Sequence, residues 1–213
     1  MTIFGSNLGP SRIATYQLSA SNVVSTALAG SRVLFNGIPA PLLYVRNDQI
    51  GAIVPYGVAG QTTAQVVVEN KGVPSGVLTI PISRSAPGLF TATASGNGQA
   101  AALNQDQSIN SDSNPAVQGS VVVLYGTGGG QTSPAGLDGQ LAGDVLPQIV
   151  LPVSVTIGGK AANVLYAGAA GDTVAGLIQI NVQLPLGIPS GDVPVVLSID
   201  GRTSQPGVTV AIR

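Results

Sequence analysis

The chain has 213 residues, a formal net charge of −1 and only 8% charged residues, and it contains no histidine, cysteine or tryptophan. This charge excludes an electrostatic surface for nucleic acid or anionic lipid, and the absence of cysteine excludes disulfides and thiolate metal sites. No apolar run reaches the ~18 residues that a membrane helix needs, so we expect no membrane insertion. The apolar residues are interrupted by 29 glycines and 15 prolines, which favours many short β-strands.

The first half of the chain is predicted to be a series of short strands separated by glycine, proline and asparagine turns. Its clearest element is a β-hairpin, because Asn36-Gly37 lies between two apolar runs. No segment shows a sustained helical period. In chain order, the predicted strands are Thr2–Phe4, Asn22–Ala29, Arg32–Phe35, Ala40–Val45, Gln49–Val54, Thr63–Glu69 and Val77–Ile82.

The second half begins with the most apolar strand of the chain, Ser120–Tyr125, which stops at the glycine cluster Gly126–Gly130. The elements that follow repeat the order of the first half, with Tyr166 at the place of Tyr44 in the hairpin. The matching strands are Val155–Ile157, Asn163–Tyr166, Leu177–Leu184, Val193–Ile199 and Gly207–Ile212. An ordered self-match of this kind indicates duplication of one module.

Each copy would have roughly 85–95 residues and about seven short strands, the size and rhythm of an immunoglobulin-like sandwich. We therefore predict an all-β fold of two tandem immunoglobulin-like β-sandwiches related by internal duplication. The first sandwich is expected at residues 1–88 and the second at 119–213. Residues 89–118 are expected to form a structured connector with an Asn/Asp-rich loop, because its apolar residues, such as Leu89 and Phe90, favour burial.

Three motifs of the first half resemble the IPT/TIG branch of immunoglobulin-like domains: Thr2–Gly9, the hairpin Leu34–Ala40, and Ile53–Gly57. A wider set of motifs closely resembles a C-terminal module of unknown function that ends large secreted proteins of acidobacterial soil bacteria. These motifs are Ser85–Phe90, Gln99–Asp106, Asn110–Ala116, Tyr125–Gly128, Gln131–Pro134 and Pro206–Val210. The resemblance covers essentially the whole chain. It implies tandem IPT/TIG-like sandwiches and export, and it implies no known activity.

We accordingly expect a secreted, extracellular or cell-surface location, with the signal peptide absent from this fragment. We also expect that the chain is not an enzyme. Without histidine the usual general base is missing, and the only lysines, Lys71 and Lys160, lie in predicted turns. Carboxylates such as Asp138 and Asp144 are sparse and loop-borne; an unfamiliar enzyme would need two of them facing each other, within about 5–10 Å, in a cleft.

One segment has the composition of a cation site. Oxygen-bearing side chains recur at every second position from residue 104 onward, and Ca²⁺ takes about six to eight oxygen ligands. The candidate Ca²⁺ ligands are Asn104, Asp106, Ser108, Asn110 and Asp112. The alternative is an Asx-rich turn that satisfies its own backbone. No other cofactor is expected.

Carbohydrate binding would use exposed aromatic side chains. Tyr44 and Tyr166 occupy equivalent places in the two copies, so we expect them to pack internally. Tyr16 and Tyr56 have no counterpart and are therefore the candidate ligand-contacting tyrosines for a glycan.

Two flat apolar runs, Thr63–Val68 and Val193–Ile199, carry little charge, so an edge position for either would invite strand addition and self-association. If both are central strands, this argument fails. The sequence thus favours a non-catalytic extracellular structural or interaction module for surface display, adhesion or self-assembly through protein–protein contacts. The alternative is an accessory carbohydrate-binding module of a secreted enzyme.

Overall fold

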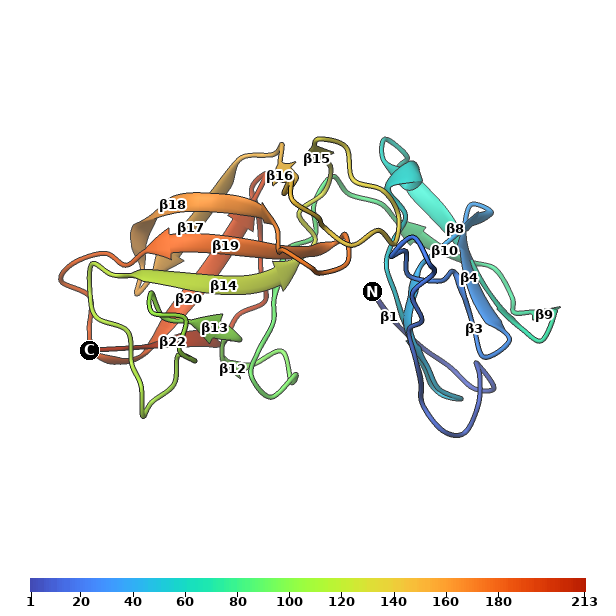
Figure 1. The fold of residues 1–213 in the computed structure, drawn as a ribbon, viewed down its shortest axis with the longest axis horizontal. Coiled ribbons are helices and arrows are strands. Elements are labelled where there is room, and N and C mark those ends of the chain that lie inside the picture. The colour runs from blue at the N-terminus through green and yellow to red at the C-terminus, as the bar shows by residue number, and fades with distance from the viewer. The chain divides into compact units, whose positions relative to one another are not determined.

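The computed structural model describes every residue from Met1 to Arg213, and its regular structure is β-strand apart from one 3-10 turn at Tyr56–Val58. It contains no helix long and apolar enough to cross a membrane. The chain forms two compact units, which Figure 1 shows with the chain coloured from blue to red. Unit 1 comprises Met1–Arg84, Gly136–Gly143 and Asp172–Ala175, and unit 2 comprises Ser85–Ala135, Asp144–Gly171 and Gly176–Arg213.

Unit 1 is a sandwich of two sheets. One sheet has the order β1 (Thr2–Phe4), β7 (Gln49–Ala52), β6 (Leu42–Val45), β2 (Ala14–Thr15). The other has the order β10 (Leu78–Pro81), β8 (Thr63–Asn70), β4 (Ser31–Phe35), β3 (Ala27–Leu28), with β5 (Ile38–Pro39) on β4 and β9 (Val73–Pro74) on β8. Both sheets bury alternate residues in one core, as Phe35 and Val66 do from one sheet and Leu42 and Ile50 from the other.

Unit 2 is built on one continuous sheet whose strands share a single core. Its main path is β11 (Gly88–Leu89), β14 (Val121–Thr127), β19 (Leu177–Gln183), β18 (Lys160–Ala169), β17 (Val153–Ile157), β20 (Gly191–Ile199), β22 (Val208–Ile212) and β12 (Gly98–Gln99). The short strands off this path are β13 (Ala102–Leu103), β15 (Thr132–Ser133), β16 (Gln148–Ile149) and β21 (Arg202–Thr203). Strand β18 pairs with β17 through its first residues and with β19 through its later ones.

The predicted all-β class and the hairpin at Gly158-Gly159 are confirmed. The turn at Asn36-Gly37 also joins paired strands, but the partner of β4 is the short β5, and most of the predicted partner, Leu42–Val45, pairs with β7 and β2 in the other sheet. Asn36 and Gly37 have φ of 51° and 80°, and Gly158 and Gly159 have φ of 59° and 76°. Two consecutive positive φ values are the signature of a type I′ turn, which joins strands with the natural right-handed twist.

Several local features occur at matching places in the two units. A register shift lies between Leu42 and Tyr44 in unit 1 and between Val164 and Tyr166 in unit 2. The hydroxyl of Ser75 accepts from the amide of Val68, and its own amide donates to the Val68 carbonyl. In unit 2, Ser204 makes the same two bonds to Leu197. The two serines each lie three residues after a glycine with positive φ, Gly72 and Gly201.

The division into units differs from the predicted boundaries in two respects. Residues 89–118 are not a connector between sandwiches but part of unit 2, where they supply β12 and β13. Figure 1 shows β12 beside β22, and β13 pairs with β14. In addition, two loops of the second half, 136–143 and 172–175, belong to unit 1. Strand periodicity identifies the strands but does not indicate which core a loop packs against. The prediction from sequence therefore assigned these segments to the wrong place.

Neither of the two flat apolar runs is an edge strand. Thr63–Val68 lies in β8, which is flanked by β10 and β4, and Val193–Ile199 lies in β20, which is flanked by β17 and β22. Their backbone groups are therefore used inside the sheets, and self-association through these two runs has no structural basis.

Candidate functional site

The Asn/Asp-rich segment is centred on the side chain of Asn110, which is buried. Its Nδ2 donates to the carbonyl of Ala211 at 2.8 Å, and its Oδ1 accepts from the amide of Ala211 at 2.9 Å. A carboxamide carries one acceptor and one donor, as a peptide group does, so Asn110 pairs with β22 as another strand would. Ala116 adds a backbone bond, because its amide also donates to the Ala211 carbonyl.

The neighbouring oxygens predicted to bind Ca²⁺ are also hydrogen-bond acceptors. Asn104 Oδ1 accepts from Asn110 Nδ2 at 2.9 Å, and Asn110 Oδ1 accepts a second bond from Gln99 Nε2 at 2.7 Å. Ser108 Oγ accepts from the side-chain amides of Asn104 and Asn114. Asn104 and Asn110 are thus brought together, but their oxygens face N–H donors.

Of the two carboxylates of the candidate set, Asp106 touches that network through Ser108, and Asp112 bonds outside it. Asp106 accepts from the hydroxyl and the amide of Ser108, and these bonds hold the pKa of the Asp106 carboxyl below its ordinary value. Asp112 instead hydrogen-bonds Asp192 at the start of β20, and this bond and the charge of Asp112 raise the pKa of Asp192. No group of three or more acidic, histidine or cysteine side chains is placed to hold a metal ion.

Among the buried side-chain oxygens of this region, only Gln99 Oε1 lacks a hydrogen-bond partner. One neutral oxygen falls far short of the about six to eight that Ca²⁺ takes. The geometry therefore matches the alternative weighed from the sequence, an Asx-rich segment whose side chains hydrogen-bond its own backbone. The segment also hydrogen-bonds the backbone of β22, through Asn110.

Two further carboxamides act as backbone partners in unit 2. Gln205 Oε1 accepts from the amide of Leu89 at 3.0 Å, and its Nε2 donates to the Leu89 carbonyl. Gln118 Oε1 accepts from the amide of Gly187, and its Nε2 donates to the Ile188 carbonyl. Sequence reasoning missed Gln205 and Gln118; an amide residue beside an apolar strand is a weak signal because most such residues are simply solvated.

The two candidate tyrosines have different environments, both within unit 1. Tyr16 is 51% exposed and follows directly after β2. Tyr56 is only half-buried, but its ring lies against Gly136, where even a Cβ atom would come within 2.5 Å of it. The backbone amide of Tyr56 donates to the Asp138 carboxylate at 2.7 Å. Tyr56 therefore packs against the 136–143 loop, and only Tyr16 retains the exposure expected of a ligand-contacting residue.

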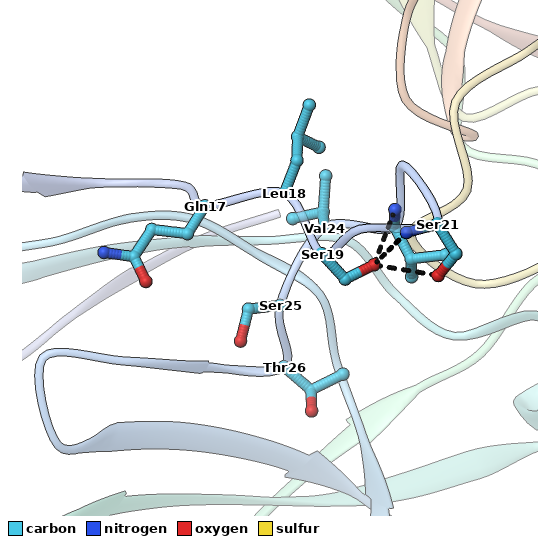
Figure 2. Close-up of a pocket in the computed structure, with 8 residues that line it drawn as sticks. Gln17, Leu18, Ser19, Ser21, Val24, Ser25 and Thr26 are labelled. Atoms are coloured by element: carbon cyan, nitrogen blue, oxygen red, sulfur yellow. Dashed lines mark hydrogen bonds between the residues drawn. The ribbon is translucent and has the colours of Figure 1, made fainter.

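A surface hollow of about 540 Å³ lies beside Tyr16 in the chain, between residues 17 and 26. Its lining is neutral and rich in hydroxyl groups: Gln17, Leu18, Ser19, Ser21, Val23, Val24, Ser25 and Thr26. In the view of Figure 2, Gln17, Ser25 and Thr26 point to one side of the backbone and Leu18 to the other.

The hydroxyls of this hollow are not all available to a ligand. Ser19 Oγ accepts from the amides of Ser21 and Val23, as the dashed lines of Figure 2 show, and Ser25 Oγ bonds both backbone groups of Ala27. The side chains of Gln17 and Thr26 have no hydrogen-bond partner within the chain, so they are the polar groups that a ligand could engage.

Two of the other acidic side chains pair with an arginine. Arg46 pairs with Asp48 and Arg32 with Glu69, both at exposed or half-exposed positions. The bond from Arg46 holds the pKa of the Asp48 carboxyl below its ordinary value. Asp138 and Asp144, predicted to flank one loop, fall in different units. Asp112 and Asp192 are the one close carboxyl pair, and both are exposed.

No protein-family model matches the chain, and no curated protein matches it. Among solved structures, it is similar to SGBP-B from a complex xyloglucan utilization locus in Bacteroides uniformis, with 13% sequence identity and a TM-score of 0.32. The match covers 97% of this chain and 43% of that one, so the chain spans less than half the length of that protein. At this level of similarity, function has to be argued from the residues of the chain itself.

Proposed function

We propose that the chain is a non-catalytic interaction module of an extracellular protein, made of two tandem immunoglobulin-like repeats of the IPT/TIG type. The repeat is supported by the features at matching positions, such as the register shifts before Tyr44 and Tyr166 and the paired bonds of Ser75 and Ser204. A bulge and a side-chain-to-backbone bond at the same place in two sheets are unlikely products of chance, because each costs a local departure from regular pairing.

The observation that carries the proposed role is the use of polar side chains. The carboxamides of Asn110, Gln205 and Gln118 serve as backbone partners that fix irregular segments, and the acidic groups of Asp48 and Asp106 bond their neighbours. Groups held in this way rigidify a scaffold and are not poised to accept or release protons on a substrate.

The test is light scattering on the purified chain over a wide concentration range, combined with a survey of hydrolytic activities. We expect mass that increases with concentration or on addition of an extracellular partner, and no turnover. Turnover of a substrate that Asp112→Asn and Asp192→Asn together abolish would overturn the proposal, because that pair is the closest approach of two carboxyl groups.

A second candidate function, glycan binding, is favoured by the hollow at residues 17–26. A neutral surface with an unpartnered carboxamide and hydroxyl, at Gln17 and Thr26, suits a polyhydroxylated ligand, and the exposed ring of Tyr16 precedes it in the chain. Electrophoresis through gels containing neutral polysaccharides tests this function. Gln17→Ala with Thr26→Val should weaken retention at least about tenfold, whereas Thr63→Val, an exposed threonine on β8, should not.

A further inference from the structure

The outer edges of the two units differ at equivalent strands. Strand β10 pairs only with β8, and β22 lies at the same place relative to β20. The equivalence can be stated residue by residue. Because Val68 matches Leu197 through the bonds of Ser75 and Ser204, Gln65 matches Pro194 by counting back along the strand. Their cross-strand partners are Thr79 and Thr209.

In unit 2 the free side of β22 is covered by the segment 88–118. Strand β12 adds to β22 in parallel, with Gly98 opposite Val208 and Gln99 opposite Thr209. The amide of Ala100 donates to the carbonyl of Thr209 at 2.8 Å. Further along, the Ala211 carbonyl accepts from Ala116 and Asn110, as described above.

In unit 1 the matching backbone groups have no cover. Gln65 bonds Asn36 with both its amide and its carbonyl, so it faces β4 and not β10. Thr79 lies opposite Gln65, and in an antiparallel pair two such residues form the non-hydrogen-bonded site. The N–H and C=O of Thr79 therefore point outward, where Thr209 accepts a bond in unit 2. Pro81, which matches Ala211, keeps a carbonyl acceptor but has no N–H.

The side chains show the same difference. Val208, Val210 and Ile212 of β22 are at most 2% exposed, and they share a core with Ala100, Ala102 and Ala116 of the covering segment. In β10 the residue that matches Val208 is Leu78, and it is 61% exposed, with Val77 beside it 60% exposed. An inward-facing leucine at this exposure marks a core that is open at its edge.

We propose that the edge of β10, residues 77–81, is a docking edge for an extended segment of the same kind as residues 98–116, supplied by another module of this type and added in parallel. This inference rests on the repeat that we propose above, and it names the partner of the interaction module. The occupant has small apolar side chains at alternate positions, facing Leu78 and Ile80, and N–H groups aimed at the carbonyls of Thr79 and Pro81. It carries no charge, as the edge Val73–Ile82 carries none and residues 96–104 carry none.

The direct test is titration of the 213-residue chain with a fluorescent peptide of residues 96–104, with binding followed by fluorescence anisotropy. We expect saturable binding, with Leu78→Asp and Thr79→Pro each weakening it at least about tenfold, or about 1.4 kcal/mol. Leu78→Asp places a charge against the apolar face, and Thr79→Pro removes the outward N–H at an edge position that tolerates proline. Ile13→Asp is the matched control, because Ile13 is 58% exposed and lies outside the edge.

A second peptide guards against non-specific adsorption. The peptide with Ala100→Pro lacks the amide that bonds Thr209 within unit 2, and it should bind at least about tenfold more weakly. Hydrogen exchange supplies a readout at the site, since the amide of Thr79 should become protected when peptide is bound.

Three results would overturn the inference. The first is no saturable binding up to about 1 mM peptide, and the second is binding that neither Leu78→Asp nor Thr79→Pro weakens. The third is a concentration-dependent dimer of the chain alone that Leu78→Asp abolishes, which would assign the edge to a second copy pairing through β10. Failure of peptide binding in a chain that still associates or still binds polysaccharide would leave the proposed function standing, so the two failures are distinguishable.

Discussion

The edge of β10 is open, whereas the edge of β22, which we propose to be the matching strand of unit 2, is covered. The difference lies in the irregular segment before β14, which in unit 2 lies against β22 and is fixed there by the carboxamide of Asn110. In unit 2, a sheet of little charge is protected at this edge by a covering segment, whereas other sheets have lysine or proline at the edge.

The largest expected effect comes from the sealed edge. Ile212→Ala removes a side chain that is fully enclosed by the covering segment and the sheet, so it should reduce the free energy of unfolding by about 2–5 kcal/mol. Leu78→Ala at the open edge should change it by less than about 0.5 kcal/mol, because most of that side chain is already in water. Denaturant unfolding of both variants measures the contrast, and equal losses would show that the β10 edge is covered in solution.

Asn110→Ala should come next, with a loss of about 2–3 kcal/mol, because it leaves the amide and carbonyl of Ala211 with fewer partners in a buried place. Hydrogen exchange should rise in β22 and in residues 98–103 and stay unchanged in β10. Ser113→Ala, on an exposed residue of the same loop whose hydroxyl meets that of Ser111, is the control. Unchanged exchange in β22 would contradict the role of Asn110 as a backbone partner.

Substitution of the two serines that bond a strand in the same way, Ser75 and Ser204, should give a smaller difference in stability. Ser204 is buried and Ser75 is exposed, although both make the same two bonds to a strand. Ser204→Ala should therefore cost about 1–2 kcal/mol and Ser75→Ala a few tenths, roughly what a buried and a solvated hydrogen bond contribute. Denaturant unfolding again provides the measurement; a larger loss for Ser75 would mean that this part of unit 1 is more enclosed than the structure has it.

The smallest effect concerns the exposed carboxyl pair formed by Asp112 and Asp192, the latter at the start of β20. Because Asp112 raises the pKa of Asp192 in the folded chain, the folded state holds more protons there than the unfolded state. Stability from this site is thus present at low pH and is lost as pH rises through the raised pKa. Asp192→Asn should raise the melting temperature slightly at pH 7 and by less at pH 3, below the raised pKa of Asp192, where the Asp192 carboxyl is protonated. Melting curves at the two pH values check the sign.

The addition of calcium should not change the stability of the folded chain. The amide oxygens of Asn104 and Asn110 already accept hydrogen bonds, and Asp106 and Asp112 bond different partners. We therefore expect the same melting temperature with Ca²⁺ and with chelator. A rise with Ca²⁺ that Asp106→Asn removes would restore the cation site predicted from the sequence.

Most β-strands and their turns could be predicted from the amino-acid sequence alone. Alternation of apolar residues and turn pairs such as Asn36-Gly37 and Gly158-Gly159 are local signals, because strand burial has a period of two and a type I′ turn needs positive φ at two adjacent residues. The matching places predicted for Tyr44 and Tyr166 agree with the register shift that precedes each of them, in β6 and in β18.

The positions of the other segments depend on long-range contacts, which the sequence does not reveal. Residues 89–118 belong to unit 2 and the loops 136–143 and 172–175 to unit 1. The two flat apolar runs, for which the sequence left edge and central positions open, are internal strands. The role of Asn104 and Asn110 could not be predicted either, because a carboxamide oxygen can bind a cation or accept a hydrogen bond from an N–H group. Which of the two it meets depends on a partner about a hundred residues away, Ala211, and long-range pairing of that kind leaves no local pattern in a single sequence.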